Sequence, residues 1–284
     1  MVGRVTAVSG SCGTCVYQVQ RYSTVPPWAS KLRAVDVFDA ALVLLAGLAA
    51  GTINAIIGSG TLITFPVLLA AGFAPVVANQ TSTLGLVPGS LAAVLGSRRD
   101  LAGHGRRTAR YAACSLVGSA TGAALLLSLP AQTFETVVPL LIAGALVLIV
   151  LQPRVARAVA ERRRPGAAEL GPVALVALTG AGVYGGYFGA AQGIMLFAVL
   201  ATALPDDLPR VNVTRNLLAA TVNAVSALVF VVLGDPDFSA AALIAVGATA
   251  GGVLGARVGR RLTPRTLRVV IVLVGLAAIA QLVL

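Results

Sequence analysis

The sequence has few of the residues that carry acid–base, redox or metal chemistry. Among 284 residues there are ten Asp and Glu, three cysteines and a single histidine, His104. A structural zinc site needs about four Cys or His ligands, so the C-x-x-C pair Cys12 and Cys15 lacks the partners to complete one. A serine nucleophile needs a general base within hydrogen-bond reach, and His104 lies in an arginine-rich stretch. We therefore expect no catalytic residue, no metal and no cofactor.

Polar surface is also scarce. Charged residues make up 11% of the chain, whereas 57% of it is hydrophobic and the mean hydropathy is +0.92. So little polar surface cannot cover a soluble globule. Several runs approach the roughly 20 apolar residues that span a bilayer, and residues 137–151 are apolar on every face, unlike the alternating strands of an outer-membrane barrel. The sequence predicts an all-α, polytopic integral membrane protein.

The net charge of +11 comes from arginines that gather between the apolar runs. Fifteen of them form three clusters: Arg98, Arg99, Arg106, Arg107 and Arg110; Arg154, Arg157, Arg162, Arg163 and Arg164; Arg257, Arg260, Arg261, Arg265 and Arg268. Because Lys and Arg are retained in cytoplasmic loops, we interpret the clusters as such loops in a multi-pass membrane protein, with contact to anionic lipid as the alternative. The lipid bilayer is an expected partner and nucleic acid is not; no oligomeric state is predicted.

Four parts are expected along the chain. Residues 1–35 are polar and form either a disordered tail or sequence upstream of a true start at Val35. Residues 36–151 form a first transmembrane repeat, 152–171 a cytoplasmic linker and 172–284 a second transmembrane repeat. The predicted apolar segments are 37–57, 61–72, 76–96, 107–129, 133–151, 172–190, 193–204, 211–233, 239–256 and 269–284.

The two repeats match in sequence. Without a gap, GTINAIIGSGTL (51–62) aligns with GVYGGYFGAAQG (182–193). At nearly the same distance further along each half, ANQTSTL (78–84) aligns with VNVTRNL (211–217). Glycine-rich segments agree easily by chance, but a second match in the same order indicates an internal duplication.

Each half has a long, a short and then three long segments. If the three arginine clusters are cytoplasmic, each half crosses an odd number of times, so the second is inverted relative to the first. Inverted repeats around a midplane site are the architecture of many secondary transporters. We predict roughly eight full transmembrane helices and two short or broken ones, because a segment of about 12 residues reaches only about 18 Å. The short segments 61–72 and 193–204 either continue a broken helix across the membrane or turn back.

Polar residues gather where the apolar segments are interrupted. A broken membrane helix is tolerated only inside protein or beside a water-filled cavity, and a helix N-terminus attracts anions through its free amides. Two polar patches result in each half, one at the break and one at the start of the next long segment. The candidate substrate-binding residues are Asn54, Gly58, Ser59, Gly60, Thr61, Asn79, Gln80, Thr81, Ser82, Gln192, Asn212, Thr214, Arg215 and Asn216.

Some of these residues also have a structural interpretation. Arg215, the one basic residue inside a predicted segment core, either binds an anion or snorkels to the interface or pairs within the protein. Asn54 and Asn223, alone on apolar faces, are more often interhelical hydrogen-bond partners than ligands. The G-x-x-x-G pairs predict close helix packing, and they lie at 47/51, 118/122, 182/186 and 251/255.

Two pairs of motifs resemble the TauE/SafE-type sulfite exporter family: GTINAIIGSGTLITFP with ANQTSTLGLVPGS, and GVYGGYFGAAQGIMLF with VNVTRNLLAATVN. The resemblance covers about residues 36–284. It implies an inner-membrane carrier of small anions, with sulfite, sulfoacetate and related sulfur or organic acids as family substrates. Ala190, Ala191 and Gln192 depart from the glycine-rich pattern in the second half, which bears on the substrate and not on the fold.

We expect a secondary transporter, an exporter or permease of small anions such as sulfite, sulfonates or organic acids, that works by alternating access around a midplane site. No segment resembles an ATP-binding phosphate loop. No Asp or Glu lies mid-span to couple transport to protons, so uniport, gradient-driven export and proton symport stay open. Two other classes are weighed: a membrane scaffold or chaperone subunit, which does not need duplicated polar breaks, and, less favoured, an intramembrane enzyme.

Overall fold

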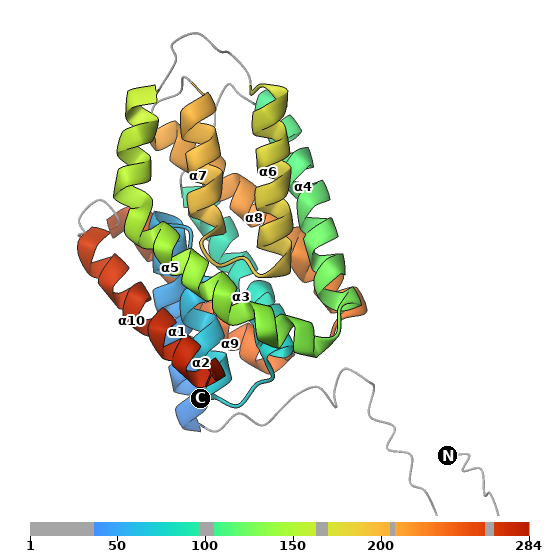
Figure 1. Ribbon diagram of the computed structural model, residues 1–284. Helices are drawn as coiled ribbons and strands as arrows, with labels where there is room; N and C mark the ends of the chain where they lie inside the picture. Colours follow the sequence, from blue (N-terminus) through green and yellow to red (C-terminus); the bar gives the residue numbers. More distant parts are fainter. Residues whose placement is uncertain (1–36, 97–104, 163–169, 205–207, 259–263, 284) are drawn as a thin grey trace, which may run out of the picture.

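The computed structural model describes residues 37–96, 105–162, 170–204, 208–258 and 264–283. Every regular element within these residues is an α-helix (Figure 1). The helices are α1 (Val37–Ile56), α2 (Thr61–Ala70), α3 (Pro75–Gly96), α4 (Gly105–Ser128), α5 (Ala131–Arg162), α6 (Pro172–Tyr187), α7 (Gln192–Ala203), α8 (Leu208–Leu233), α9 (Phe238–Val258) and α10 (Pro264–Val283). The predicted all-α fold is confirmed for this part of the chain. The predicted tail 1–35, with Cys12 and Cys15, and His104 lie outside the described residues.

The helices follow the order of long and short segments predicted from the sequence. The short ones, α2 and α7, have 10 and 12 residues. The largest difference is α5, which continues through Pro153 to Arg162, whereas the apolar segment ends at residue 151. Residues 154–162 are rich in Arg and Ala, which favour a helix, so a search for apolar runs misses them. The first part of the predicted linker 152–171 is therefore helical.

Two pairs of helices reach the interior from opposite ends of the molecule (Figure 1). α6 and α7 pack side by side, and their outer ends lie at the top of Figure 1, where α5 ends. α1 and α2 also pack on each other, with their outer ends at the bottom, near the end of α10. The turns within these pairs, residues 57–60 and 188–191, are largely buried. We call them the first break and the second break.

Glycines bring neighbouring helices into backbone contact. A Cβ added at Gly51 of α1 would lie 2.2 Å from the carbonyl oxygen of Ala248 on α9, and one added at Gly122 of α4 would lie 2.0 Å from that of Val183 on α6. No side chain fits at such distances, so the helices pack this closely only because these residues are glycine. Close packing is thus confirmed for all four predicted pairs: 47/51 and 251/255 between α1 and α9, and 118/122 and 182/186 between α4 and α6.

The outer surface of the helix bundle is apolar. Large hydrophobic side chains such as Leu140 and Val173 are exposed, Val173 to 82%. Such a surface is suited to lipid rather than to water. Within the described residues, five helices are long and apolar enough to cross a membrane by length and composition, over Phe38–Ile56, Arg107–Ser128, Ala131–Arg154, Arg210–Leu233 and Phe238–Arg257.

Candidate functional site: two helix breaks in contact

Both short helices begin at a break without a side-chain cap. Gly60 precedes α2 and Ala191 precedes α7, and neither forms a side-chain cap hydrogen bond. The first amides of a helix have no partner within it, so these two N-termini attract negative charge. Gly58 has a φ of 86°, which glycine adopts freely. Ala191 has a φ of 60°, a left-handed conformation that costs an alanine about 1–2 kcal/mol.

The two breaks are in direct contact. The backbone amide of Gly193, in the first turn of α7, donates a hydrogen bond of 3.1 Å to the carbonyl oxygen of Gly58. A Cβ added at Gly193 would lie 2.5 Å from the Cα of Gly58. We call this backbone contact between Gly58 and Gly193 the glycine crossing. It brings the N-terminal turn of α7 against the first break.

Arg215 of α8 lies beside the glycine crossing. Its side chain is only 2% exposed, and a Cβ added at Gly58 would lie 2.9 Å from its Nη1 atom. Nη2 donates to the carbonyl oxygen of Ala55, near the end of α1, at 3.1 Å and to Oδ1 of Asn216. These two partners are neutral, and no carboxylate of the described residues pairs with the guanidinium. Arg215 is therefore buried and does not snorkel.

Three buried polar atoms around the crossing have no hydrogen-bond partner: Ser59 Oγ, Gln192 Nε2 and Arg215 Nε. Ser59 belongs to the first break and is fully buried, and Gln192 begins α7. A buried polar group left without a partner costs about 1–3 kcal/mol, so native proteins retain few of them. The guanidinium and amide nitrogens only donate, and a hydroxyl also donates. Together the three atoms are suited to an acceptor such as the oxygens of an anion.

Thr61 contacts the second break, and Gln192 packs within the second half. Thr61 is buried at the start of α2, and its Oγ1 lies 3.6 Å from a Cβ added at Gly189 in the second break. The amide end of Gln192 occupies the space over Gly185, where a Cβ would lie 2.4 Å from Oε1. The predicted residues of the two breaks, together with Arg215, therefore form one cluster.

Each broken helix is capped by a helix of the other half. Asn79 Nδ2, on α3, donates to the carbonyl oxygen of Tyr187 at the end of α6 at 2.9 Å. Arg215, on α8, donates to Ala55 near the end of α1. The last carbonyls of a helix have no partner within it, so these contacts stabilise the broken ends. Asn79 Oδ1 remains buried without a partner. A neutral amide thus caps one broken helix, and a cation caps the other.

The rest of the polar run on α3 binds protein groups. Gln80 Oε1 and Thr81 Oγ1 accept hydrogen bonds from the backbone amides of Asp235 and Asp237, both at 2.9 Å. The hydroxyl of Ser82 bonds a hydroxyl on α2. Gln80 and Thr81 therefore fix the connection between α8 and α9 and lie apart from the cluster at the breaks.

The matching run on α8 surrounds Arg215. Thr214 and Asn216 are buried and Asn212 is half-buried. Asn216 Oδ1 accepts a hydrogen bond from Arg215 Nη2, which fixes the orientation of the guanidinium. Asn216 is thus a neighbour that positions the cation at the first break.

A polar node joins three helices near the breaks. Ser90 Oγ, on α3, accepts hydrogen bonds from Asn54 Nδ2 at 3.0 Å and from Asn223 Nδ2 at 3.1 Å, and it donates to Leu86 O at 2.9 Å. Asn54 and Asn223 therefore act as interhelical partners between α1, α3 and α8. Ser90 is not among the residues predicted to form the site. Continuing the alignment of ANQTSTL with VNVTRNL would have paired Ser90 with Asn223 and drawn attention to it.

The chemistry of this site is hydrogen-bond donation around a single positive charge. Within the described residues, no group of three or more His, Cys, Asp or Glu side chains could hold a metal ion. Long apolar helices, a lipid-facing surface and two interior helix breaks define a multi-pass membrane protein. The model of the sulfite exporter TauE/SafE family matches residues 43–282, and the chain belongs to this family.

Curated relatives agree with this assignment. The "probable membrane transporter protein YfcA" of Escherichia coli K12 is 30% identical over 234 residues, which cover 82% of this chain and 85% of the relative. A "probable membrane transporter protein" of Haemophilus influenzae is 27% identical over 243 residues, covering 86% of this chain and 94% of the relative. No solved structure matches the chain. The protein is a membrane transporter, and the family assignment supports the expectation that it is not an enzyme.

Proposed function

We propose that the chain is a secondary transporter of a small anion, such as sulfite, a sulfonate or an organic acid, that binds at the two breaks. Arg215 carries this proposal, because its guanidinium is buried beside the first break and no described carboxylate pairs with it. A buried charge without a counter-charge is costly and usually functional. A bound anion supplies the counter-charge and accepts hydrogen bonds from Ser59, Gln192 and the Nε of Arg215.

The geometry favours a compact oxyanion with a single charge. The buried guanidinium of Arg215, the N-termini of α2 and α7, and the unpaired polar atoms of Ser59 and Gln192 all belong to the two breaks or lie next to them. Oxygens of hydrogensulfite, the singly charged form of sulfite, or of a sulfonate or carboxylate head group are able to accept from several of these donors at once. Among its described residues, the cluster has no further cation to neutralise a more highly charged anion.

We also propose that residues 36–151 and 172–284 are two inverted repeats. Under this duplication α1 corresponds to α6, α2 to α7, and so on to α5 and α10. The packing of α1 on α9 then corresponds to the packing of α6 on α4. In the same way, the packing of α2 on α10 corresponds to the packing of α7 on α5. A duplicated, inverted fold is expected to repeat its contacts in this way. Of the roughly eight long helices, α1 and α6 would end at the midplane, and α2 and α7 would turn back from it.

Alternating access follows from the burial of the site. Ser59, Thr61 and Gln192 are at most 7% exposed, so a substrate reaches them only if the helices around the breaks move. In the proposed orientation, the end of the molecule that carries Arg110 and Arg154 faces the cytoplasm, and the membrane is the bacterial inner (plasma) membrane. The two hairpins would then open to opposite sides of it.

The test is anion flux in proteoliposomes that contain the purified full-length chain. We expect sulfite or one of the related anions to be transported by the wild type. Arg215→Gln should lower the rate at sub-saturating substrate by about tenfold or more, because a hydrogen bond to a charged group is worth about 1.5–3 kcal/mol. Ser59→Ala should give a smaller loss in the same direction.

Ser115→Ala is the matched control. Ser115 Oγ is also buried without a partner, but it lies on α4 and outside the cluster at the breaks. This variant should transport as the wild type does. Wild-type transport by Arg215→Gln would refute the site, and failure of every sulfur and carboxylic anion tested to cross would refute the proposed substrate class.

A further inference from the structure

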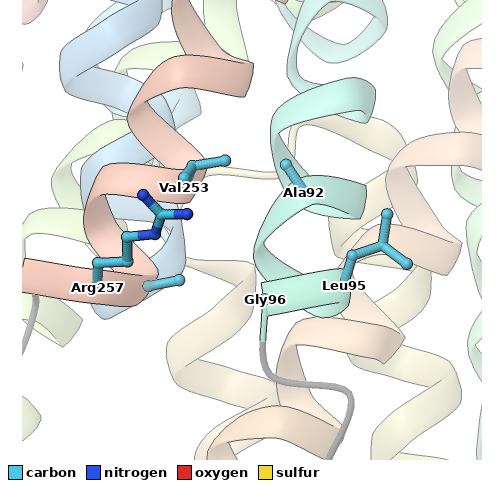
Figure 2. A pocket seen from close by; sticks show the side chains of 6 residues that line it. Ala92, Leu95, Gly96, Val253 and Arg257 are labelled. Carbon is cyan, nitrogen blue, oxygen red and sulfur yellow. The ribbon is translucent and has the colours of Figure 1, made fainter.

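A cavity of about 430 Å³ lies between α3 and α9, away from the two breaks. Figure 2 shows Ala92, Leu95 and Gly96 on α3 and, across from them, Val253 and Arg257 on α9. Its walls are small or apolar apart from Arg257. Arg257 lies in the last turn of α9 and is exposed. The cavity therefore has an apolar body and one positively charged rim.

A second hollow continues from the first along the same helix. It is lined by Ala245, Val246, Thr249, Ala250 and Val253, all on α9. The second hollow is shallow and lies along α9 alone, and Val253 borders both hollows; we call the strip of surface that they cover the α9 groove. From Ala245 to Arg257 the helix rises by about 18 Å, at about 1.5 Å per residue, more than half of the roughly 30 Å hydrocarbon thickness of a bilayer. The groove is thus long enough for much of an extended acyl chain.

The open side of the α9 groove faces the apolar exterior. Val246 is 66% exposed, and Leu91 and Leu95 on the neighbouring face of α3 are also exposed. These side chains belong to the surface that meets hydrocarbon in a membrane protein. An acyl chain in the groove would therefore remain continuous with the surrounding lipid, with its head group at the level of Arg257.

We propose that the α9 groove binds one anionic phospholipid, with an acyl chain against α9 and the phosphate on the guanidinium of Arg257. The charge of the rim selects the head group, because a basic residue at the membrane surface attracts anionic lipid with about 1 kcal/mol. In a parallel dimer that used the same groove, the two Arg257 side chains would approach each other across the two-fold axis. Like charges would oppose that contact, so lipid is the favoured occupant.

The experiment titrates the full-length chain in detergent with phosphatidylglycerol or with phosphatidylcholine of the same acyl chains, and counts bound lipids by native mass spectrometry. The wild type should bind phosphatidylglycerol about fivefold more tightly than phosphatidylcholine. Arg257→Gln should remove this preference. Val253→Trp, which fills the groove, should weaken binding of both lipids. Arg154→Gln is the control, because Arg154 is an exposed arginine on α5.

Three outcomes would overturn the proposal. Equal losses of phosphatidylglycerol in Arg257→Gln and Arg154→Gln would mean that charge acts diffusely over the whole surface. If Arg257→Gln still preferred phosphatidylglycerol, Arg257 would not bind the lipid phosphate. Its charge would then act only on the C-terminal dipole of α9. A dimer that is disrupted by Val253→Trp but not by Arg257→Gln would show that a second copy fills the groove.

Discussion

Arg215 and Ser82 occupy the same position when VNVTRNL is aligned with ANQTSTL. The Ser82 hydroxyl bonds a hydroxyl on α2, whereas the guanidinium of Arg215 reaches across to the first break. Two similar halves thus contribute one neutral residue and one charged residue. The charge of the proposed substrate depends on Arg215, while Ser59 and Gln192 affect the shape of the space around it. Substitutions at these last two positions should alter which anion fits without altering its charge.

Ser90→Ala tests the polar node. The variant removes a hydroxyl that accepts from Asn54 and Asn223 and donates to Leu86. We expect the free energy of unfolding to fall by about 1 kcal/mol, because two amide groups lose a partner. The measurement is the thermal unfolding midpoint in detergent.

Thr121→Ala is the control for Ser90→Ala. Thr121 is exposed on α4, and its hydroxyl bonds a carbonyl of its own helix at 2.9 Å. Its removal breaks no link between helices, so the unfolding midpoint should stay close to that of the wild type. Equal midpoints for the two variants would contradict a role of Ser90 in joining α1, α3 and α8.

The short helices are the elements on which the site depends, and the sequence predicted them well. α2 and α7 follow glycine-rich breaks, and both the breaks and the short apolar runs were visible in the sequence. The polar end of α5 was missed because only its propensity, not its hydropathy, favours a helix. A search for apolar runs detects the part of a helix that lies in lipid. It does not detect the continuation of that helix into water.

Gly193→Ala tests the glycine crossing. The added Cβ would lie 2.5 Å from the Cα of Gly58, so the two breaks would have to separate. Overpacking of this kind costs about 1–3 kcal/mol, and the displaced N-terminus of α7 should reduce anion flux as well. Both the unfolding midpoint and the flux in proteoliposomes should fall.

Gly144→Ala is the matched substitution for the crossing. Gly144 lies in α5, and a Cβ added there has no neighbour within 4 Å. Since alanine is a better helix former than glycine by about 1 kcal/mol, this variant should be as stable as the wild type or more so, with normal flux. If Gly193→Ala behaved like Gly144→Ala, the close contact of the breaks would be without consequence.

The arrangement of the whole molecule combines contacts that the sequence predicted with others that it did not. Motifs within one segment, such as the G-x-x-x-G pairs, indicated close packing but not which helices would meet. The polar run on α3 was predicted to bind substrate as one group, yet Gln80 and Thr81 hold the α8–α9 connection. That distinction depends on contacts between residues far apart in the chain, and a single sequence does not report them.

The proposed inversion predicts the side of the membrane on which each residue is labelled. Single cysteines at Phe38, Glu135, Arg154 and Val173, in a background without the native cysteines, should react with an impermeant maleimide in two groups. Phe38→Cys and Glu135→Cys should be labelled in intact cells, and Arg154→Cys and Val173→Cys only after permeabilisation. All four residues are exposed.

Two comparisons within this set are decisive. Glu135 and Arg154 lie near opposite ends of the predicted span in α5, so labelling on one side would show that α5 does not cross. Phe38 and Val173 begin α1 and α6. If they were labelled from the same side, the two repeats would be parallel rather than inverted.

The glycine crossing is made of main-chain atoms: an amide, a carbonyl and two Cα atoms in close approach. Its geometry requires glycine at positions 58 and 193 but places no demand on the identity of the side chains nearby. Descendants of a common ancestor are therefore free to exchange residues such as Ser59, Gln192 or Ala191 while they keep the same joint between the halves. Among relatives that transport different substrates, we expect substitutions at these neighbouring residues and glycine at positions 58 and 193.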